Sequence, residues 1–154
     1  NIDINDYTLK DIRDNISYIS QNEVLYTDTI KNNIILDREI NDIEYLNICK
    51  LTYVNDVIKN SNEGHNLLLE ENGINLSGGQ RQRIILARSL LKTSSIVLID
   101  EGLNEIDIKL ERQILNNIFN YYKDRTFIII SHRLNNLDLF NNIIKLESRN
   151  INEL

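Results

Sequence analysis

Short, continuous apolar runs along the chain predict its strands. The segments "ISYIS" (16–20), "SIVLI" (95–99) and "TFIII" (126–130) are short and rich in β-branched residues. The second and third runs are almost entirely apolar, a pattern typical of strands that are buried on both faces of a parallel sheet. Near the end of the chain, segments 142–148 and 150–154 are interpreted as a closing hairpin.

Between these runs, apolar residues recur at helical spacing. Segment 27–36 begins with a capping threonine and predicts a short helical turn, and segment 41–60 predicts two short helices. Residues 61–73 follow as a loop that contains two glycines. The apolar positions on which the prediction for 41–60 rests are Ile43, Leu46, Ile48, Leu51, Val54 and Ile58.

Longer helical patterns follow the loop. Ser77 is a suitable N-cap for a helix that runs to about Leu91, and residues 106–122 predict a second amphipathic helix. The apolar face of the first helix consists of Ile84, Leu86, Ala87, Leu90 and Leu91. This alternation of strands and helices predicts an α/β fold with a parallel core, which segment 41–60 interrupts as part of a small helical subdomain.

Composition narrows the class of protein without identifying it. A length of 154 residues suits one domain, and 42 % apolar with 26 % charged residues argues against disorder. The net charge of −6 argues against a nucleic-acid partner. Cys49 is the only cysteine, so it forms no internal disulfide, and we expect it to be buried on a helix. No apolar run is long enough to span a bilayer.

Three side chains that can bind a metal ion, activate water or contact a phosphate follow two of the predicted strands. Asp100 and Glu101 lie at the sheet edge where ligands collect in open α/β sheets. An aspartate there can hold hydrated Mg²⁺ and an adjacent glutamate can polarise an attacking water, although two solvated loop carboxylates are the plain alternative. His132 alone would be a structural hydrogen-bonding residue, but its place at the same edge favours contact with a phosphate oxygen.

The sequence "SGGQ" (77–80) stands directly before a predicted helix. Helix N-termini present free N–H groups and the positive end of a dipole, so they bind anions. Gly78 and Gly79 allow another backbone to approach closely. Taken alone, this segment has a plain alternative interpretation: a flexible, glycine-containing helix start that binds no anion.

Together, these segments resemble the ABC ATPase family. "NLSGGQRQRIILARSL" is similar to the signature motif, "SIVLIDE" to the Walker B strand with its catalytic glutamate, and "FIIISHR" to the switch-histidine segment. "ISYISQNEVLYTDTIKNNI" resembles the Q-loop. Four separated motifs in the family's order make a chance match negligible. The resemblance implies a P-loop NTPase-like sheet core, with residues 28–92 as the helical subdomain and the rest of 1–154 in the core.

The resemblance also implies roles in ATP hydrolysis. Glu101 is expected to be the general base, and His132 to contact the γ-phosphate. Asp100 is expected to bind Mg²⁺, largely through water. Gln21 is expected to contact Mg²⁺ or the attacking water in the catalytic site and to relay the nucleotide state to the membrane domain. The residues expected at the nucleotide of the other subunit in a head-to-tail dimer are Ser77, Gly78, Gly79, Gln80 and Asp107.

The subgroup that the motifs resemble is the exporters. The "TI..NI" pattern after the Q-loop, "ENGINLSGGQRQR" and "SHRLNNLDLFNNIIKL" are similar to exporter segments. The resemblance therefore implies fused transmembrane helices, a place on the cytoplasmic face of a bacterial cell membrane and an exported substrate, with peptide slightly preferred to lipids or drugs. No nucleic acid is implied as a partner.

Two departures from the family pattern affect these expectations. The D-loop reads Asn104-Glu105-Ile106-Asp107 where the family has Ser-Ala-Leu-Asp, which puts signalling between subunits through this loop in question. No "GxxxxGK[ST]" loop occurs, and the chain contains no methionine. We therefore expect a C-terminal part of a nucleotide-binding domain, which cannot bind ATP alone and exposes a sheet edge or an apolar face.

Two other functions compete with transport. The first is a soluble ABC ATPase of DNA repair or chromosome maintenance, but Gln21 and the signature lie close in the sequence with no heptads between them. The second is an interaction module that does not hydrolyse ATP, against which the intact Asp100, Glu101 and His132 argue.

Overall fold

Three parallel strands form the centre of the computed structural model, which describes residues 3–146. They are β1 (Ile16–Ile19), β2 (Ile96–Asp100) and β3 (Thr126–Ile130), and they lie in the order β1-β2-β3. The register places Ile19 beside Ile99, and Ile99 beside Ile129. The predicted strands and their parallel arrangement are confirmed. Because all three strands run in one direction, the residues that follow them meet at one edge of the sheet.

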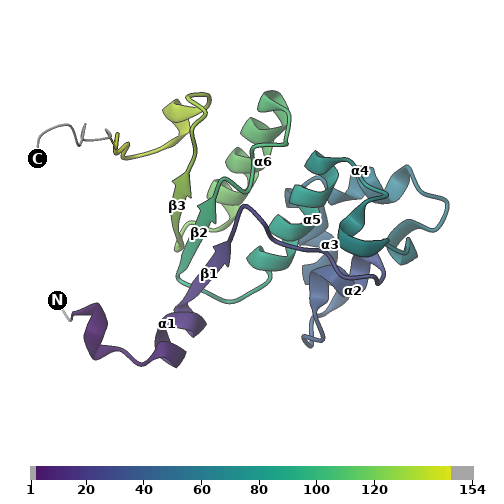
Figure 1. Ribbon diagram of the computed structural model, residues 1–154, viewed down its shortest axis with the longest axis horizontal. Helices are drawn as coiled ribbons and strands as arrows, with labels where there is room; N and C mark the ends of the chain where they lie inside the picture. The colour runs from purple at the N-terminus through teal and green to yellow at the C-terminus, as the bar shows by residue number, and fades with distance from the viewer. Residues whose placement is uncertain (1–2, 147–154) are drawn as a thin grey trace, which may run out of the picture.

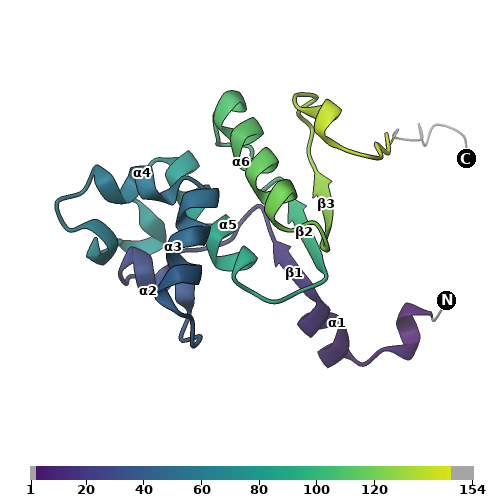
Figure 2. The same cartoon turned by 180° about the vertical axis from the view of Figure 1, so that it is seen from behind.

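One face of the sheet is covered by helices and the other is open. Ser17, Ile19, Val97 and Ile99 point to the covered face and are buried. In Figure 2, α6 (Ile108–Tyr121) lies in front of the sheet, while Figure 1 shows the opposite face of the sheet, with no helix over it. The covered face also contacts α5 (Gly78–Leu90) through β1.

The open face corrects one expectation about the strands. The third strand was expected to be buried on both faces, but Ile128 and Ile130 are each 48 % exposed. Tyr18 on β1 is 52 % exposed on the same face. Within residues 3–146, no helix packs over these side chains, so only one face of β3 is shielded from water. The predicted exposed apolar face is therefore present.

A cluster of helices stands beside the sheet (Figure 1). It contains α2 (Ile30–Ile35), α3 (Asp42–Leu51), α4 (Val54–Lys59) and α5. The two helices predicted in 41–60 and the helix capped by Ser77 are confirmed. The N-cap of α2 is Thr29 and not the first threonine of the segment, because it is the Thr29 side chain that accepts a hydrogen bond from the Asn32 amide. The assignment of residues 28–92 to a separate subdomain stays a prediction.

The buried face of α3 differs from the expected one. Ile43 is 82 % exposed and Leu46 is 48 % exposed, whereas Tyr45, Ile48 and Cys49 are buried. Tyr45 takes this place because its ring packs inward while its hydroxyl pairs with His65 Nδ1 at 2.8 Å. The expected burial of Cys49 is confirmed, and burial raises the pKa of its thiol to about 11. On α5, the predicted apolar face is buried.

The two ends of the described chain contain short elements. Before β1 lie a 3₁₀ turn (Ile4–Asp6) and α1 (Leu9–Asn15), a helix that the sequence analysis missed although Thr8 and Asp11 form a capping box. After β3 comes a 3₁₀ turn (Leu137–Leu139). Residues 142–146 form no strand, so the predicted hairpin is not seen there, and its remainder, 147–154, lies outside the described residues.

Candidate functional site

The carboxyl edge of the sheet gathers the residues expected to carry the chemistry. Asp100 is the last residue of β2 and Glu101 follows it. His132 lies just beyond β3, and Gln21 just beyond β1. This placement follows from the parallel arrangement of three strands that are nearly equal in length.

Glu101 and His132 are in direct contact. His132 Nδ1 lies 3.3 Å from Glu101 Oε1, and Asn104 Nδ2 donates to Glu101 Oε2 at 3.2 Å. The Glu101 backbone has a φ of 54°, a left-handed conformation that is costly for a residue other than glycine. Its amide donates to the carbonyl of Ile130 at 3.0 Å, which holds this turn against β3. The carboxylate is thus fixed in place, while the exposed His132 ring can reach a ligand.

Asp100 offers carboxylate oxygens at the same edge. Tyr18 Oη donates to Asp100 Oδ2 at 3.2 Å, and this hydrogen bond raises the pKa of the tyrosine. Mg²⁺ is typically bound by one or two carboxylates, with water and substrate phosphates as the other ligands. The single Asp100 carboxylate fits that partial ligand set, in which water and phosphate oxygens supply the remaining ligands. No group of three or more His, Cys, Asp or Glu side chains suitable for a metal occurs within residues 3–146.

Gln21 is exposed and lines a hollow of about 250 Å³ between the segment after β1 and the start of α5. The opposite wall includes Arg81, Gln82 and Glu105. Among the described residues, the Gln21 side chain forms no hydrogen bond with Asp100 or Glu101. The structure therefore brings Glu101 and His132 together but leaves Gln21 beside the helical cluster.

The start of α5 is a capping box. Gln80 Oε1 accepts a hydrogen bond from the Ser77 amide at 2.8 Å, and Ser77 Oγ accepts one from the Gln80 amide at 3.3 Å. Gly78 and Gly79 do allow a close approach, but the approaching chain is the loop after β2, at Glu105. Asp107 caps α6 by accepting hydrogen bonds from two amides in its first turn. Its expected role toward a nucleotide stays a prediction.

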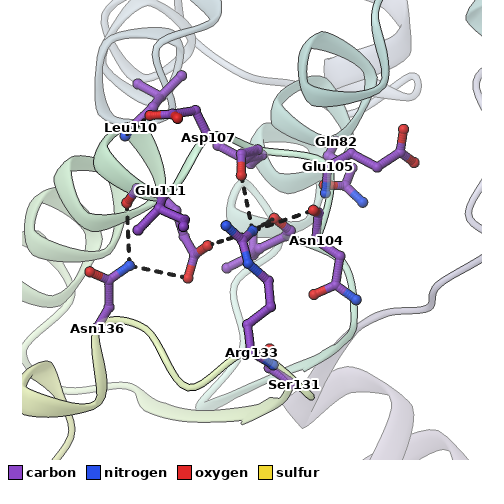
Figure 3. Close-up of polar contacts among 12 residues, drawn as sticks. Gln82, Asn104, Glu105, Asp107, Leu110, Glu111, Ser131, Arg133 and Asn136 are labelled. Carbon is purple, nitrogen blue, oxygen red and sulfur yellow. Dashed lines mark hydrogen bonds and ion pairs between the residues drawn. The ribbon is translucent and has the colours of Figure 1, made fainter.

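The sequence did not predict an ionic cluster of Arg133, Glu111 and Asn136, which lies near the carboxyl edge of the sheet (Figure 3). Arg133 Nη1 lies 2.9 Å from Glu111 Oε2 on α6 and donates to the carbonyl of Ile106 at 3.0 Å. Asn136 Nδ2 donates to the other carboxylate oxygen of Glu111 at 3.3 Å. Burial raises the pKa of Glu111, and Asn136 and Arg133 oppose that shift. A glutamate on the apolar face of a predicted helix was the signal in the sequence.

A second buried cation joins α5 to the segment after β1. Arg88 Nε donates to the Asn33 carbonyl at 2.7 Å, and Nη1 donates to the Val24 carbonyl at 2.8 Å. Its side chain is 5 % exposed and lies 3.6 Å from a carboxylate oxygen of Glu23. Arg88 therefore links α5, the helix capped by Ser77, to the segment that follows Gln21.

Comparison with known proteins agrees with these motifs. The family described as "ABC transporter" matches residues 1–104. Curated relatives include the ATP-dependent lipid A-core flippases of Pectobacterium atrosepticum, 38 % identical over 98 % of this chain, and Salmonella typhimurium, 36 % identical over 94 %. The chain spans about a quarter of the length of these relatives, 26 % and 25 %.

Among solved structures, the chain is similar to a bacterial Atm1-family ABC exporter with ATP bound. The TM-score is 0.80 with 34 % identity, and the match covers 86 % of this chain and 23 % of the other. In the part of the chain that the structure describes, no helix has both the length and the apolar character needed to cross a membrane.

Proposed function

The chain belongs to the ABC transporter family, and we propose that it forms part of an ATP-hydrolysing domain that powers export by a larger membrane protein. The expected exporter type agrees with its similarity to the flippases and to the Atm1-family exporter. The observation that carries the proposal is the contact between Glu101 and His132, one from each of two neighbouring strand ends.

Within this proposal, Glu101 accepts the proton of the water that attacks the γ-phosphate. Asn104 and His132 hold its two carboxylate oxygens, so that the base is oriented before substrate arrives. The exposed His132 donates a hydrogen bond to a γ-phosphate oxygen. Asp100 and Gln21 would hold Mg²⁺, largely through water, and the ion supplies positive charge that neutralises the phosphates.

The second half of each site comes from a partner in this proposal. The free amides at the start of α5 face the nucleotide of a second nucleotide-binding domain in a head-to-tail dimer. Ser77, Gly78, Gly79 and Gln80 supply that surface, and Asp107 lies nearby at the start of α6. Positioning and charge stabilisation make up most of the catalysis of phosphoryl transfer, so both halves are required.

Gln21 is proposed to pass the nucleotide state to a fused transmembrane domain. It directly follows β1 at the carboxyl edge and lines the same hollow as Arg81 and Gln82 of α5. Arg88 ties the following segment to the same helix, so a movement at Gln21 is transmitted to the helical cluster. In this arrangement the domain works on the cytoplasmic face of the membrane.

The cargo is proposed only as a class. The slight preference for peptide finds no support in the relatives, which are named as lipid A-core flippases. A lipid is therefore the better-supported substrate class. A DNA-repair ATPase is not favoured, because the relatives are named as flippases. A module without hydrolysis is not favoured, because those flippases are named as ATP-dependent and Glu101 and His132 are in contact.

The test is Glu101→Gln in the full-length protein. The change removes the proton acceptor but keeps its size, so ATP hydrolysis should fall by about 10²–10⁴-fold while ATP still binds. Glu63→Gln, on an exposed turn, is the matched loss of one charge and should keep normal turnover. Near-normal hydrolysis by Glu101→Gln would remove Glu101 from its role.

A further inference from the structure

Glu105 lies against the first turn of α5. A Cβ placed on Gly78 would come 1.5 Å from Glu105 Oε2, and one on Gly79 would come 2.8 Å from the Glu105 carbonyl oxygen. At Gly79 the close atom belongs to the backbone, so this approach requires glycine there. At Gly78 the close atom is the end of a flexible side chain, so a Cβ there would require the Glu105 carboxylate to move aside. The Glu105 carboxylate of the same chain therefore packs against the first turn of α5.

The backbone and the carboxylate of Glu105 are held differently. The Glu105 amide donates to Gln82 Oε1 at 2.7 Å, and Gln82 is buried, so the loop is firmly attached to α5 (Figure 3). The carboxylate is half exposed, and its partner is Arg81 Nη2 at 3.1 Å. Exposed ion pairs of this kind contribute only about 0–1 kcal/mol. The side chain can therefore leave while the loop stays in place.

The position of this carboxylate conflicts with the ligand proposed for the same helix. The N-terminus of a helix favours one nearby anion through its unpaired amides and its dipole. Ser77 Oγ takes up the Gln80 amide and leaves the amides of Gly78 and Gly79 available. A phosphate that approaches them meets the negative charge of Glu105, where the D-loop pattern of the family has an uncharged alanine.

We propose that Glu105 is an internal anion that competes with the partner's terminal phosphate for the start of α5. It raises the ATP concentration at which the two nucleotide-binding domains close. Closure then requires the carboxylate to turn away from Gly78 and to release Arg81. The inference rests on the proposed function, which places that phosphate at residues 77–80.

The test measures closure without hydrolysis. In the full-length protein carrying Glu101→Gln, Mg-ATP is titrated while the distance between labels on the two nucleotide-binding domains is followed. Adding Glu105→Gln should lower the half-saturating ATP concentration by about two- to fivefold, the range expected for one charge at a helix end. The shift should shrink at high salt because the effect is electrostatic. Glu63→Gln should leave the half-saturating concentration unchanged.

Glu105→Ala tests whether the effect depends on the charge of the side chain or on its size, because Glu105→Gln keeps the size and Glu105→Ala does not. It also removes the negative charge, so it should lower the half-saturating concentration as Glu105→Gln does. An unchanged or raised concentration in both variants would overturn the inference, since Glu105 would then be neutral or helpful to closure. If the Glu101→Gln background shows no ATP-dependent closure at all, the proposed function fails and the inference fails with it.

Discussion

Arg133 Nη1 lies 2.9 Å from Glu111 Oε2, and both side chains are largely buried, at 17 % and 10 % exposed. The same guanidinium donates to the carbonyl oxygens of Leu103, Asn104 and Ile106. One arginine next to His132 thus holds the loop that contains Asn104 and Glu105. This pair joins three parts of the fold: the end of β3, the loop after β2 and α6.

Loss of Arg133 should destabilise the fold strongly. Arg133→Met leaves the Glu111 carboxylate buried without its cation, and breaking such a pair should cost about 3 kcal/mol. Adding Glu111→Gln removes the uncompensated charge, so the double variant should recover part of the loss. Urea unfolding of the four proteins in this double-mutant cycle measures the coupling. Additive effects would show that the two side chains do not interact in solution.

Gln21→Ala in the full-length transporter should reduce transport more than it reduces ATP affinity. The reason is its place in the hollow beside α5, apart from the Glu101–His132 contact. Transport into vesicles and nucleotide binding are measured on the same preparation. Asn62→Ala, on an exposed turn outside this hollow, serves as the control. Collapse of ATP affinity with unchanged transport per ATP hydrolysed would contradict the relay role.

The isolated chain should neither bind nor hydrolyse ATP appreciably. Residues 1–154 contain no glycine-rich phosphate loop with its lysine, so no backbone amides surround the α- and β-phosphates. Asp100 and Glu101 alone bring negative charge toward a polyanion, which is repulsive. Calorimetric titration with Mg-ATP measures binding. Micromolar affinity would show that the nucleotide cradle lies within these residues.

The isolated chain should also self-associate through the open face of the sheet. Tyr18, Leu98 and Ile128 lie side by side across the strands, and Tyr18 and Ile128 are about half exposed. Light scattering should report a dimer or a larger species. Ile128→Thr should shift it toward monomer, whereas Ile144→Thr, at an exposed site outside the three strands, should not. A monomer at high concentration would argue against this contact.

The local pattern of residue types along the sequence was enough to predict most helices and strands and the residues of the candidate site. Continuous apolar runs marked the strands, and "SGGQ" marked the start of α5, because both signals depend on residues close in sequence. The carboxyl edge with Asp100, Glu101 and His132 followed from parallel topology alone. The α1 helix was missed although its capping box is equally local, and the buried face of α3 was offset because Tyr45 packs inward.

The sequence by itself determined the family, the strands and the chemistry available at the sheet edge, since these follow from residue types and their order. Only the tertiary structure decided which side chains touch. The Arg133–Glu111 pair and the contact of Glu105 with Gly78 join residues more than twenty positions apart, and they depend on how loops and helices pack. Which face of β3 is buried was decided in the same way, because an apolar strand is shielded only where another element covers it.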